Sequence, residues 1–392
     1  MFEHVEAAPP DAILGLTESF KADENPNKIN LGVGVYKDEA GQTPVLAAVK
    51  AAEKLLLDRE TSKSYLPITG SPEYGQHVQK MLFGEAGDER VRTCHSPGGT
   101  GGLRVGGDFL RKLAPEASIW VSTPTWANHT GIFTAAGIPI RDYRYYSPET
   151  RNVDTEGFFA DLEGVPSGDV VLLHVCCHNP TGVDLNHEQW GRVCEIAQNK
   201  GWIPFFDFAY QGFGDGVKED CAALAPFYAS GMEFLVASSF SKNFGLYNER
   251  TGALSLVCKS KAEADAAFSH MKLCIRTNYS NPSSHGGAIV NTILTDEGLT
   301  QQWLDELAAM RVRIKDMRSA FVDGLKSRGV EQDFSYIEAQ RGMFSFSGLS
   351  DVQVATLREK NSIYIVKGGR INVAGITPAN IDYLCDAVAA VL

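Results

Sequence analysis

A lysine that stands among hydroxyl groups and is followed by an arginine is the most chemically suggestive feature of the sequence. Lys242 comes just after residues 234–237, an apolar run that is typical of a buried strand. Burial can lower the pKa of a lysine, and the neutral amine forms Schiff bases with carbonyl compounds such as pyridoxal phosphate (PLP). Ser239, Ser241 and Arg250 offer hydroxyl and guanidinium donors, which suit a phosphate group. The alternative is a solvated lysine beside a structural arginine.

A second candidate for phosphate binding is the glycine-rich segment 96–104, which opens a predicted helix. Free backbone N–H groups and the helix dipole attract an anion at such a start. The segment is not a dinucleotide fingerprint, because Arg104 stands where the third glycine belongs, and no Gly-Lys-Ser/Thr closes it as in a P-loop. We expect Gly98, Gly99 and Thr100 to hold a phosphate, with a plain tight turn as the alternative.

An acidic residue inside an aromatic strand requires a partner. Asp207 lies between Phe206 and Phe208, and a buried charge is costly unless it is paired. A protonated pyridine nitrogen is one such partner, and PLP enzymes use an aspartate there. Capping a neighbouring helix or meeting an arginine is the alternative. Tyr210 and Asn179 could both reach the phenolic oxygen of the same cofactor.

Three ring side chains could complete this site. Trp126 offers a flat face for a pyridine ring, although most tryptophans belong to the core. His129 and His178 could tune the site, but we favour a core or loop role for each. The eight cysteines are scattered without paired CxxC spacing, so we expect reduced core thiols and no metal site.

Two arginines indicate what a substrate would carry. Arg370 follows two glycines and could bind a carboxylate bidentately, while Arg276 is a second candidate unless it is simply a surface residue. Two separate arginines fit a dicarboxylate such as aspartate or glutamate. Gly32 and Gly34 leave one side of the backbone bare, so either a ligand approaches there or the segment is a glycine-rich turn.

The elements that must position these residues follow a strand–helix alternation. Apolar strands predicted at 119–122, 170–177, 202–210, 234–237 and 253–258 are separated by helical segments, which indicates an α/β fold with a parallel sheet covered on both faces. In such sheets the ligand sits beyond the carboxyl ends of the strands. Five candidates fall at or just past such ends: Trp126, Asn179, Asp207, Tyr210 and Lys242.

The two termini are predicted to form other structures. Residues 299–325 form a long helix, and a smaller α+β lobe follows, with strands at 343–346 and 363–366 and a helix at 351–360. Pro9-Pro10-Asp11 begins an irregular lead-in that cannot be helix interior, and a short helix follows to about Lys21. An extended apolar arm of this kind commonly packs on a second subunit.

The bulk composition excludes several classes of function. A formal net charge of −12 argues against general nucleic-acid binding and against anionic membranes. No apolar run approaches the roughly 18 residues that span a bilayer. The first residues lack the basic and apolar regions of a secretory signal, so we expect a cytoplasmic protein.

Five segments give the chain a specific resemblance, which covers essentially its whole length: 32–38, 97–101, 177–182, 207–213 and 239–247. On these segments the sequence resembles the class I aminotransferases of PLP fold type I, most closely the aspartate aminotransferase subgroup and its aromatic relatives. The resemblance implies a large PLP-binding domain at 44–310, and a small domain made from residues 1–43 and 311–392 that closes on substrate.

The resemblance also implies roles for the residues around the cofactor ring. Lys242 would hold PLP as a Schiff base and then move a proton between the substrate Cα and the cofactor C4′. Asp207 would keep the pyridine nitrogen protonated, and Trp126 would stack on the ring. Tyr210 and Asn179 would hydrogen-bond the phenolic oxygen.

Further implied roles concern the phosphate, the substrate and a partner. The family forms homodimers with shared active sites, so two implied residues come from the second subunit. The implied phosphate ligands are Gly99, Thr100, Ser239, Arg250 and Tyr65 of the partner subunit. The implied substrate ligands are Arg370, Asn179 and the Gly34 backbone for the α-carboxylate, and Arg276 of the partner subunit for the distal carboxylate.

Substrate choice within the subgroup is a finer question. Features of the aspartate branch are Val35, Lys37, Thr43, Thr100 and Asn281, whereas Ser64 and Pro67 depart from its pattern. Arg276 also occurs in dual-specificity relatives. We therefore predict aspartate with 2-oxoglutarate, and hold tyrosine or phenylalanine as the second choice. A β-decarboxylase or lyase on the same fold, and a non-catalytic PLP-binding regulator, are the remaining alternatives.

Overall fold

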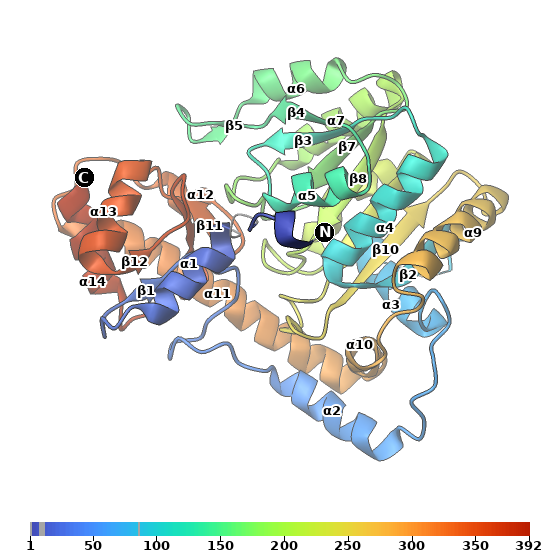
Figure 1. Cartoon of the computed structure of the whole chain (residues 1–392), viewed down its shortest axis with the longest axis horizontal. Coiled ribbons are helices and arrows are strands. Elements are labelled where there is room, and N and C mark those ends of the chain that lie inside the picture. The colour runs from blue at the N-terminus through green and yellow to red at the C-terminus, as the bar shows by residue number, and fades with distance from the viewer. Residues whose placement is uncertain (1, 8–11, 85–86) are drawn as a thin grey trace. The chain divides into compact units, whose positions relative to one another are not determined.

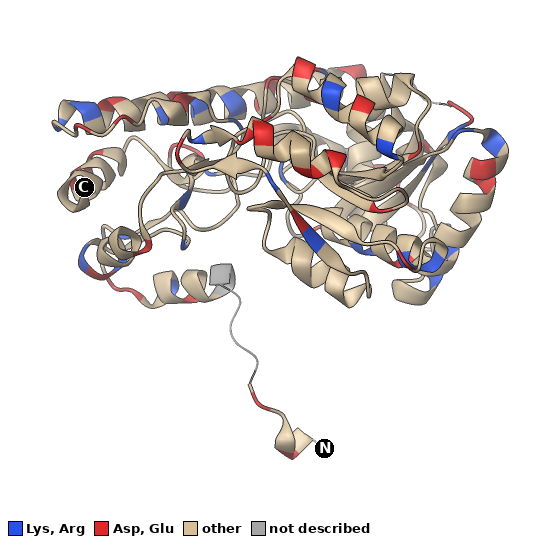
Figure 2. Cartoon of the chain, turned by 90° about the horizontal axis from the view of Figure 1, so that it is seen from above, with Lys and Arg blue, Asp and Glu red and all other residues tan. Residues whose placement is uncertain are grey.

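The computed structural model describes residues 2–7, 12–84 and 87–392 (Figure 1). It consists of two compact units, one formed by Met1–Thr43 with Arg313–Leu392 and the other by Pro44–Val312. Helix α11 (Glu297–Ser327) contributes residues to both units, and basic and acidic residues are interspersed along it (Figure 2). The predicted irregular lead-in at Pro9-Pro10-Asp11 lies outside the described residues.

A seven-stranded sheet forms the centre of the Pro44–Val312 unit. In chain order its strands are β2 (Val91–Pro97), β3 (Ile119–Thr123), β4 (Ile140–Arg144), β7 (Val170–His174), β8 (Ile203–Phe208), β9 (Phe234–Ser239) and β10 (Thr251–Val257). The spatial order is β2-β10-β9-β8-β7-β3-β4. β10 pairs antiparallel with both neighbours, whereas the other pairs are parallel. The predicted α/β fold with a mainly parallel sheet is confirmed.

Helices cover both faces of this sheet, as two adjacent residues of β8 demonstrate. Phe205 packs against the ring of Phe133 and lies so close to helix α4 (Gly98–Leu113) that a Cβ on Gly106 would be 2.4 Å from its ring. Phe206 instead packs against Trp190 and Phe227. Because successive strand residues point to opposite faces, the sheet is buried on both sides.

The remaining elements of this unit surround the sheet and precede or follow its strands. The helices are α2 (Ala47–Arg59), α3 (Pro72–Phe83), α4 (Gly98–Leu113), α5 (Asn128–Ala135), α6 (Thr155–Glu163), α7 (His187–Lys200), α8 (Ala225–Ala229), α9 (Lys261–Asn278), α10 (His285–Thr295) and the 3-10 turn η2 (Glu219–Ala223). A small hairpin is formed by β5 (Tyr146–Ser147) and β6 (Asn152–Val153).

The other unit is an α+β structure with two small sheets. β1 (Ile29–Asn30) pairs parallel with β12 (Ile363–Tyr364), and β11 (Phe344–Phe346) pairs antiparallel with β13 (Arg370–Asn372). Its other elements are η1 (Phe2–His4), α1 (Ala12–Ala22), α12 (Tyr336–Ala339), α13 (Asp351–Asn361), η3 (Val373–Gly375) and α14 (Ile381–Val391).

Several details differ from the sequence-based predictions. The strands β2 and β4 were not predicted, because their mixed polar and apolar residues lack a clear period. The strand predicted at 170–177 ends at His174, and Cys177 adopts a φ of +53°, which extended strand backbone does not allow. All eight cysteines are free thiols. Within the described ranges, no helix is both long and apolar enough to cross a bilayer.

Candidate active site

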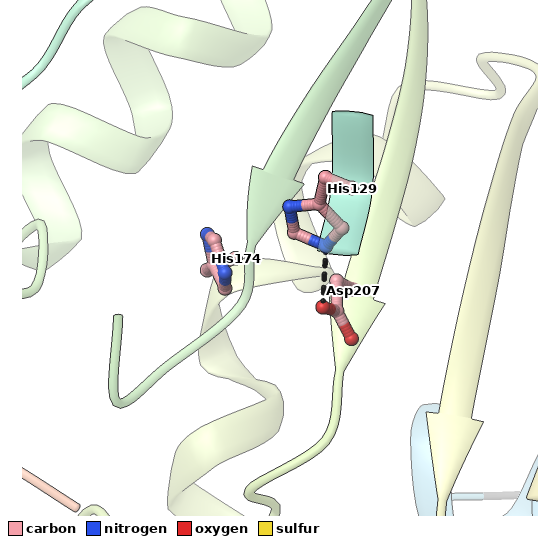
Figure 3. Close-up of side chains that lie close together, drawn as sticks. All are labelled: His129, His174 and Asp207. Carbon is pink, nitrogen blue, oxygen red and sulfur yellow. Dashed lines mark hydrogen bonds and ion pairs between the residues drawn. The ribbon is translucent and has the colours of Figure 1, made fainter. Parts of the chain in front are cut away.

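Asp207 is held at the carboxyl end of β8 by a histidine from α5. Its side chain is only 6% exposed, and Oδ2 lies 3.0 Å from His129 Nε2 (Figure 3). His129 Nδ1 lies 2.8 Å from the Thr125 hydroxyl, so Nε2 can carry the proton that is donated to Asp207. Burial acts to raise the pKa of Asp207, but the His129 hydrogen bond and nearby positive charge outweigh it and lower the pKa. Asp207 is therefore a buried carboxylate that stays ionised.

Two more histidines lie behind this pair. The parallel register of β7 and β8 places His174 beside Asp207, and the His174 ring is 5.2 Å from the His129 ring (Figure 3). The His178 ring is 4.5 Å from the His174 ring. Burial lowers the pKa of His174 to about 3 and holds the pKa of His178 well below its usual value. Both rings are thus neutral at physiological pH, so they add no competing positive charge beside the Asp207–His129 pair.

Three of these residues, His129, His174 and Asp207, also have the side-chain types that bind metal ions. Potential ligand atoms of His129, His174 and Asp207 lie within 4.8 Å of one another. His129 and Asp207 already form a hydrogen bond with each other. The arrangement is therefore explained by a donor–acceptor pair, and the expectation of no metal site remains a prediction.

Lys242 lies in the turn that follows β9, close to the charge of Asp207. Its side chain is half-buried, and its Nζ atom is 4.8 Å from the centroid of the buried Tyr210 ring. Burial lowers the pKa of Lys242 to about 8, with a further lowering from Arg250 and an opposing effect of Asp207. A substantial fraction of this amine is neutral near physiological pH, which a nucleophile or proton carrier requires.

The other candidates at the strand ends lie in the same unit. Trp126 is half-buried, and its ring meets His129 edge to face at 5.3 Å. Asn179 is buried in the segment that follows β7. The structure thus joins Trp126, His129 and Asp207 into one series of contacts, and places Lys242 over Tyr210.

Backbone and side-chain donor groups lie close together at the start of α4. Gly98 has a φ of +70°, and an added Cβ there would lie 2.6 Å from Arg250 Nη2. An added Cβ on Gly99 would lie 3.1 Å from Cβ of the buried Ser239. The first N–H groups of a helix have no intrahelical partners, so they add to these donors. Glycine at both positions therefore keeps open a cradle suited to a phosphate. Thr100 follows as a half-buried residue of the same turn.

Arg370 lies in the other unit, on β13, and its guanidinium is fixed by its surroundings. Nη2 donates to the Gly32 carbonyl at 2.5 Å, and Cζ lies 4.2 Å from the centroid of the Phe344 ring. An added Cβ on Gly34 would be 3.0 Å from that same ring. Asn372 Nδ2 also donates to the carbonyls on either side of Gly34. A larger residue at position 34 would therefore displace the aromatic support of Arg370.

Tyr65 and Arg276 are exposed, as Arg250 also is, whereas the other candidates described above are buried or half-buried. Tyr65 is 94% exposed in the loop between α2 and α3. Arg276, near the end of α9, is exposed and donates to the Ser280 hydroxyl. Asn281 Nδ2 donates to the Leu66 carbonyl at 3.2 Å, which ties the segment after α9 to the Tyr65 loop. Both side chains therefore lie on the surface, in segments that this bond links.

Comparison with known proteins decides the family. The profile described as aminotransferase class I and II matches residues 26–388. The chain belongs to this aminotransferase family. A relative named aspartate aminotransferase, from Salmonella typhi, is 53% identical over the full length of both chains. An aromatic-amino-acid aminotransferase from Pseudomonas aeruginosa is 44% identical over all of this chain and 98% of its own.

A solved structure of a relative supports the same family assignment. The crystal structure of an aromatic-amino-acid aminotransferase from Burkholderia pseudomallei, covalently bound to pyridoxal phosphate, superposes with a TM-score of 0.98. It shares 49% sequence identity, and the match covers all of this chain and 99% of the other. The predicted resemblance to class I aminotransferases is confirmed.

The sequence predicted a buried role for His129 but not its partner. We favoured a core or loop role for His129, and the side chain is indeed fully buried, but it also donates to Asp207. A helix cap or an arginine was the alternative partner considered for Asp207. The useful signal was the position of His129 three residues after Trp126, past the end of β3.

Proposed function

We propose that this aminotransferase depends on PLP and transfers the amino group between L-aspartate and 2-oxoglutarate by a ping-pong route. The products would be oxaloacetate and L-glutamate. The observation that carries the proposal is the position of the Lys242 amine, which lies over the Tyr210 ring. Its pKa is lowered by burial, and the charge of Asp207 acts on it in the opposite direction. The high identity to the Salmonella typhi aspartate aminotransferase supports the choice of substrate.

The donor set around Lys242 fits PLP in three independent ways. An amine of lowered pKa suits the aldehyde, and a buried ionised carboxylate suits a protonated pyridine nitrogen. The open cradle at Gly98 and Gly99, with Ser239 and Arg250, suits the phosphate. When bound, the cofactor would supply an electron sink for the carbanion formed at the substrate Cα.

Lys242 and Asp207 would divide the proton chemistry between them. Asp207 stays ionised through its bond to His129, so it can hold a proton on the ring nitrogen throughout turnover. With a pKa of about 8, Lys242 can accept a proton from the substrate Cα and return it nearby. Tyr210 and Asn179 would hydrogen-bond the phenolic oxygen, and Trp126 would cover the ring face.

The substrate carboxylates would be bound by arginines from two chains. We propose that Arg370, with Asn179 and the Gly34 backbone, binds the α-carboxylate, because its guanidinium is already fixed by Gly32 and Phe344. Arg276 and Tyr65 of a second copy would bind the distal carboxylate and the phosphate. Their exposure supports a homodimer in which each chain completes the site of the other.

An aromatic amino acid aminotransferase is the second candidate. The observation in its favour is the TM-score of 0.98 to the Burkholderia pseudomallei enzyme of that name. A dual-specificity enzyme would combine both activities. The assignment of residues 44–310 as the cofactor-binding domain, and a cytoplasmic location, remain predictions.

The decisive experiment combines a spectrum with product analysis. We expect the purified protein with PLP to show an absorption band at the visible edge, which Lys242→Ala abolishes. With aspartate and 2-oxoglutarate it should form oxaloacetate, and kcat/KM should be larger for aspartate than for tyrosine or phenylalanine. A colourless protein that ignores PLP would refute the proposal, and release of CO₂ or ammonia would indicate a decarboxylase or lyase.

A further inference from the structure

The loops that carry Tyr210 and Lys242 are joined by a buried hydrogen bond. Asn243 is 1% exposed, and its Nδ2 donates to the Gln211 carbonyl at 3.1 Å. Gln211 directly follows Tyr210, and Asn243 directly follows Lys242. The bond therefore couples the backbone beside the amine to the backbone beside the ring over which the amine lies.

The Tyr210 side of this link is itself anchored. Gln211 Nε2 donates to the carbonyls of Met81 and Val217, each at 3.0 Å. The buried carboxylate of Asp220 accepts the N–H of Gly212 at 2.7 Å and binds three more backbone N–H groups of the same loop. A carboxylate with four backbone donors holds its loop rigidly, so the Gln211 carbonyl is a fixed point.

The Lys242 side is anchored from helix α11. Trp303 is 1% exposed, and its Nε1 donates to the Asn243 carbonyl at 2.7 Å. Its ring also stacks on Phe244, with centroids 4.3 Å apart and planes 12° apart. Two consecutive residues after Lys242 are therefore held by one tryptophan, which touches both the backbone and the neighbouring ring.

We propose that Asn243 and Trp303 are positioning residues that hold the Lys242 amine over Tyr210 and beside Asp207. The inference rests on the proposed function, since that function makes Lys242 the reacting amine. A lysine side chain is flexible, so the position of its amine depends on the backbone from which it extends. A displacement of about 1 Å at a reacting group can cost roughly 100-fold in rate.

A tryptophan pair allows a controlled test of this role. Trp303→Phe removes the N–H that binds Asn243 but keeps an aromatic ring against Phe244. Trp202→Phe is the matched control, because Trp202 is also 1% exposed and its Nε1 donates to a backbone carbonyl, that of Leu162, at 3.2 Å. Both variants lose one buried hydrogen bond of the same type, so thermal unfolding should report similar destabilisation.

The measurements that separate the two variants concern Lys242 itself. In the apoprotein, the amine can be titrated by NMR after ¹³C-methylation, with Lys242→Ala as the assignment control. In the holoenzyme, the titration of Lys242 is followed through the pH dependence of the visible absorption. We expect Trp303→Phe to raise the pKa of Lys242 by roughly half a unit or more, because a displaced amine is better solvated. We also expect kcat for aspartate to fall roughly 10- to 100-fold, with a smaller change in KM.

The possible outcomes are distinct. Equal shifts in the Lys242 titration for Trp303→Phe and Trp202→Phe, or no shift in either, would overturn the inference. If Trp303→Phe does not fold, Asn243→Ser removes the bond to Gln211 and must produce the same upward shift, and an unchanged pKa in that variant would also reject the role. A wild-type protein without PLP absorption or aspartate turnover would instead reject the proposed function.

Discussion

The side chains around Lys242 and the pair formed by Tyr65 and Arg276 are held in opposite ways. Lys242, Asp207 and Tyr210 are buried or half-buried and make contacts with their own chain. Tyr65 and Arg276 are exposed, although the Tyr65 loop is tied through Asn281 to the segment after α9, the helix that carries Arg276. A single chain therefore builds the group that would react, while the two residues proposed to complete the site of a second copy, one at the phosphate and one at the distal carboxylate, face outward.

This difference has a physical origin. A neutral lysine and an ionised aspartate require low solvent access and fixed partners, which the ends of a covered sheet supply. A guanidinium that selects a free carboxylate must instead remain open until the ligand and a second surface arrive. Four experiments test whether the two regions have these separate roles.

The largest effect is expected from Lys242→Ala. Removing the amine that carries the proton should lower aspartate turnover by at least roughly 10⁴-fold and should abolish the visible absorption with PLP. Lys259→Ala is a suitable control, because Lys259 is exposed and its ion pair with Glu233 is at the surface. Retention of turnover in Lys242→Ala would contradict the central role of the buried group.

A smaller and more selective effect is expected from Arg276→Asp. Loss of the proposed partner for the distal carboxylate should lower kcat/KM for aspartate roughly 10²- to 10³-fold and leave phenylalanine turnover much less affected. Arg192→Asp, at an exposed ion pair with Glu163, is the control. An equal loss for both substrates would mean that Arg276 does not select the substrate.

The same variant can test whether sites are shared between chains. Mixing the inactive Lys242→Ala and Arg276→Asp proteins should restore about a quarter of wild-type activity, because half of randomly assorted dimers are hybrids with one intact site of two. If activity does not recover after subunits exchange, Lys242 and Arg276 of the same chain act in one site. The exposure of Arg276 would then not be explained by a site shared between chains.

The smallest effect concerns the stability of the apoprotein. Below pH 8, Lys242 is protonated in both states and its burial opposes folding, so Lys242→Met should be more stable than wild type by roughly 1–3 kcal/mol. Between pH 8 and 10.5 the folded protein releases this proton before the unfolded chain does. Wild type therefore gains relative stability with rising pH, and the difference should disappear above that window.

Denaturant unfolding across this pH range measures the effect. Arg276→Met serves as the comparison and should change stability by less than about 0.5 kcal/mol at any pH, since Arg276 is exposed. A pH-independent difference for Lys242→Met would show that its amine is not strained by burial.

Much of the fold could be predicted from hydrophobic pattern, with recognisable exceptions. The five apolar strands that the sequence predicts are all present, because strands buried on both faces have nearly continuous apolar sequences. The edge strand β4 was missed, since three of its five residues are exposed or charged. The direction of β10 was also not predictable, because the strand sequence carries no signal for parallel or antiparallel pairing.

The residues of the candidate site were predictable to the extent that their chemistry is local. Lys242, Asp207 and the glycines at 98 and 99 could be named because an amine, a buried acid and a bare helix start have distinctive residue types next to clear elements. Asp207 and Lys242 fall at or just past the ends of predicted strands, which was enough to expect both at one edge of the sheet. The strand before Gly98, β2, was not predicted, so the sequence did not place the two glycines at that edge.

The partners of those residues depend on long-range packing. His129 meets Asp207 across 78 residues of sequence, and Trp303 meets Asn243 across 60. No local pattern encodes these contacts, because they form only when separate helices dock on the sheet and exclude water. The sequence alone therefore determines which groups can react, through residue type and spacing. The ionised state of Asp207, the lowered pKa of Lys242 and the rigidity of the turn that carries Lys242 arise only when the core assembles.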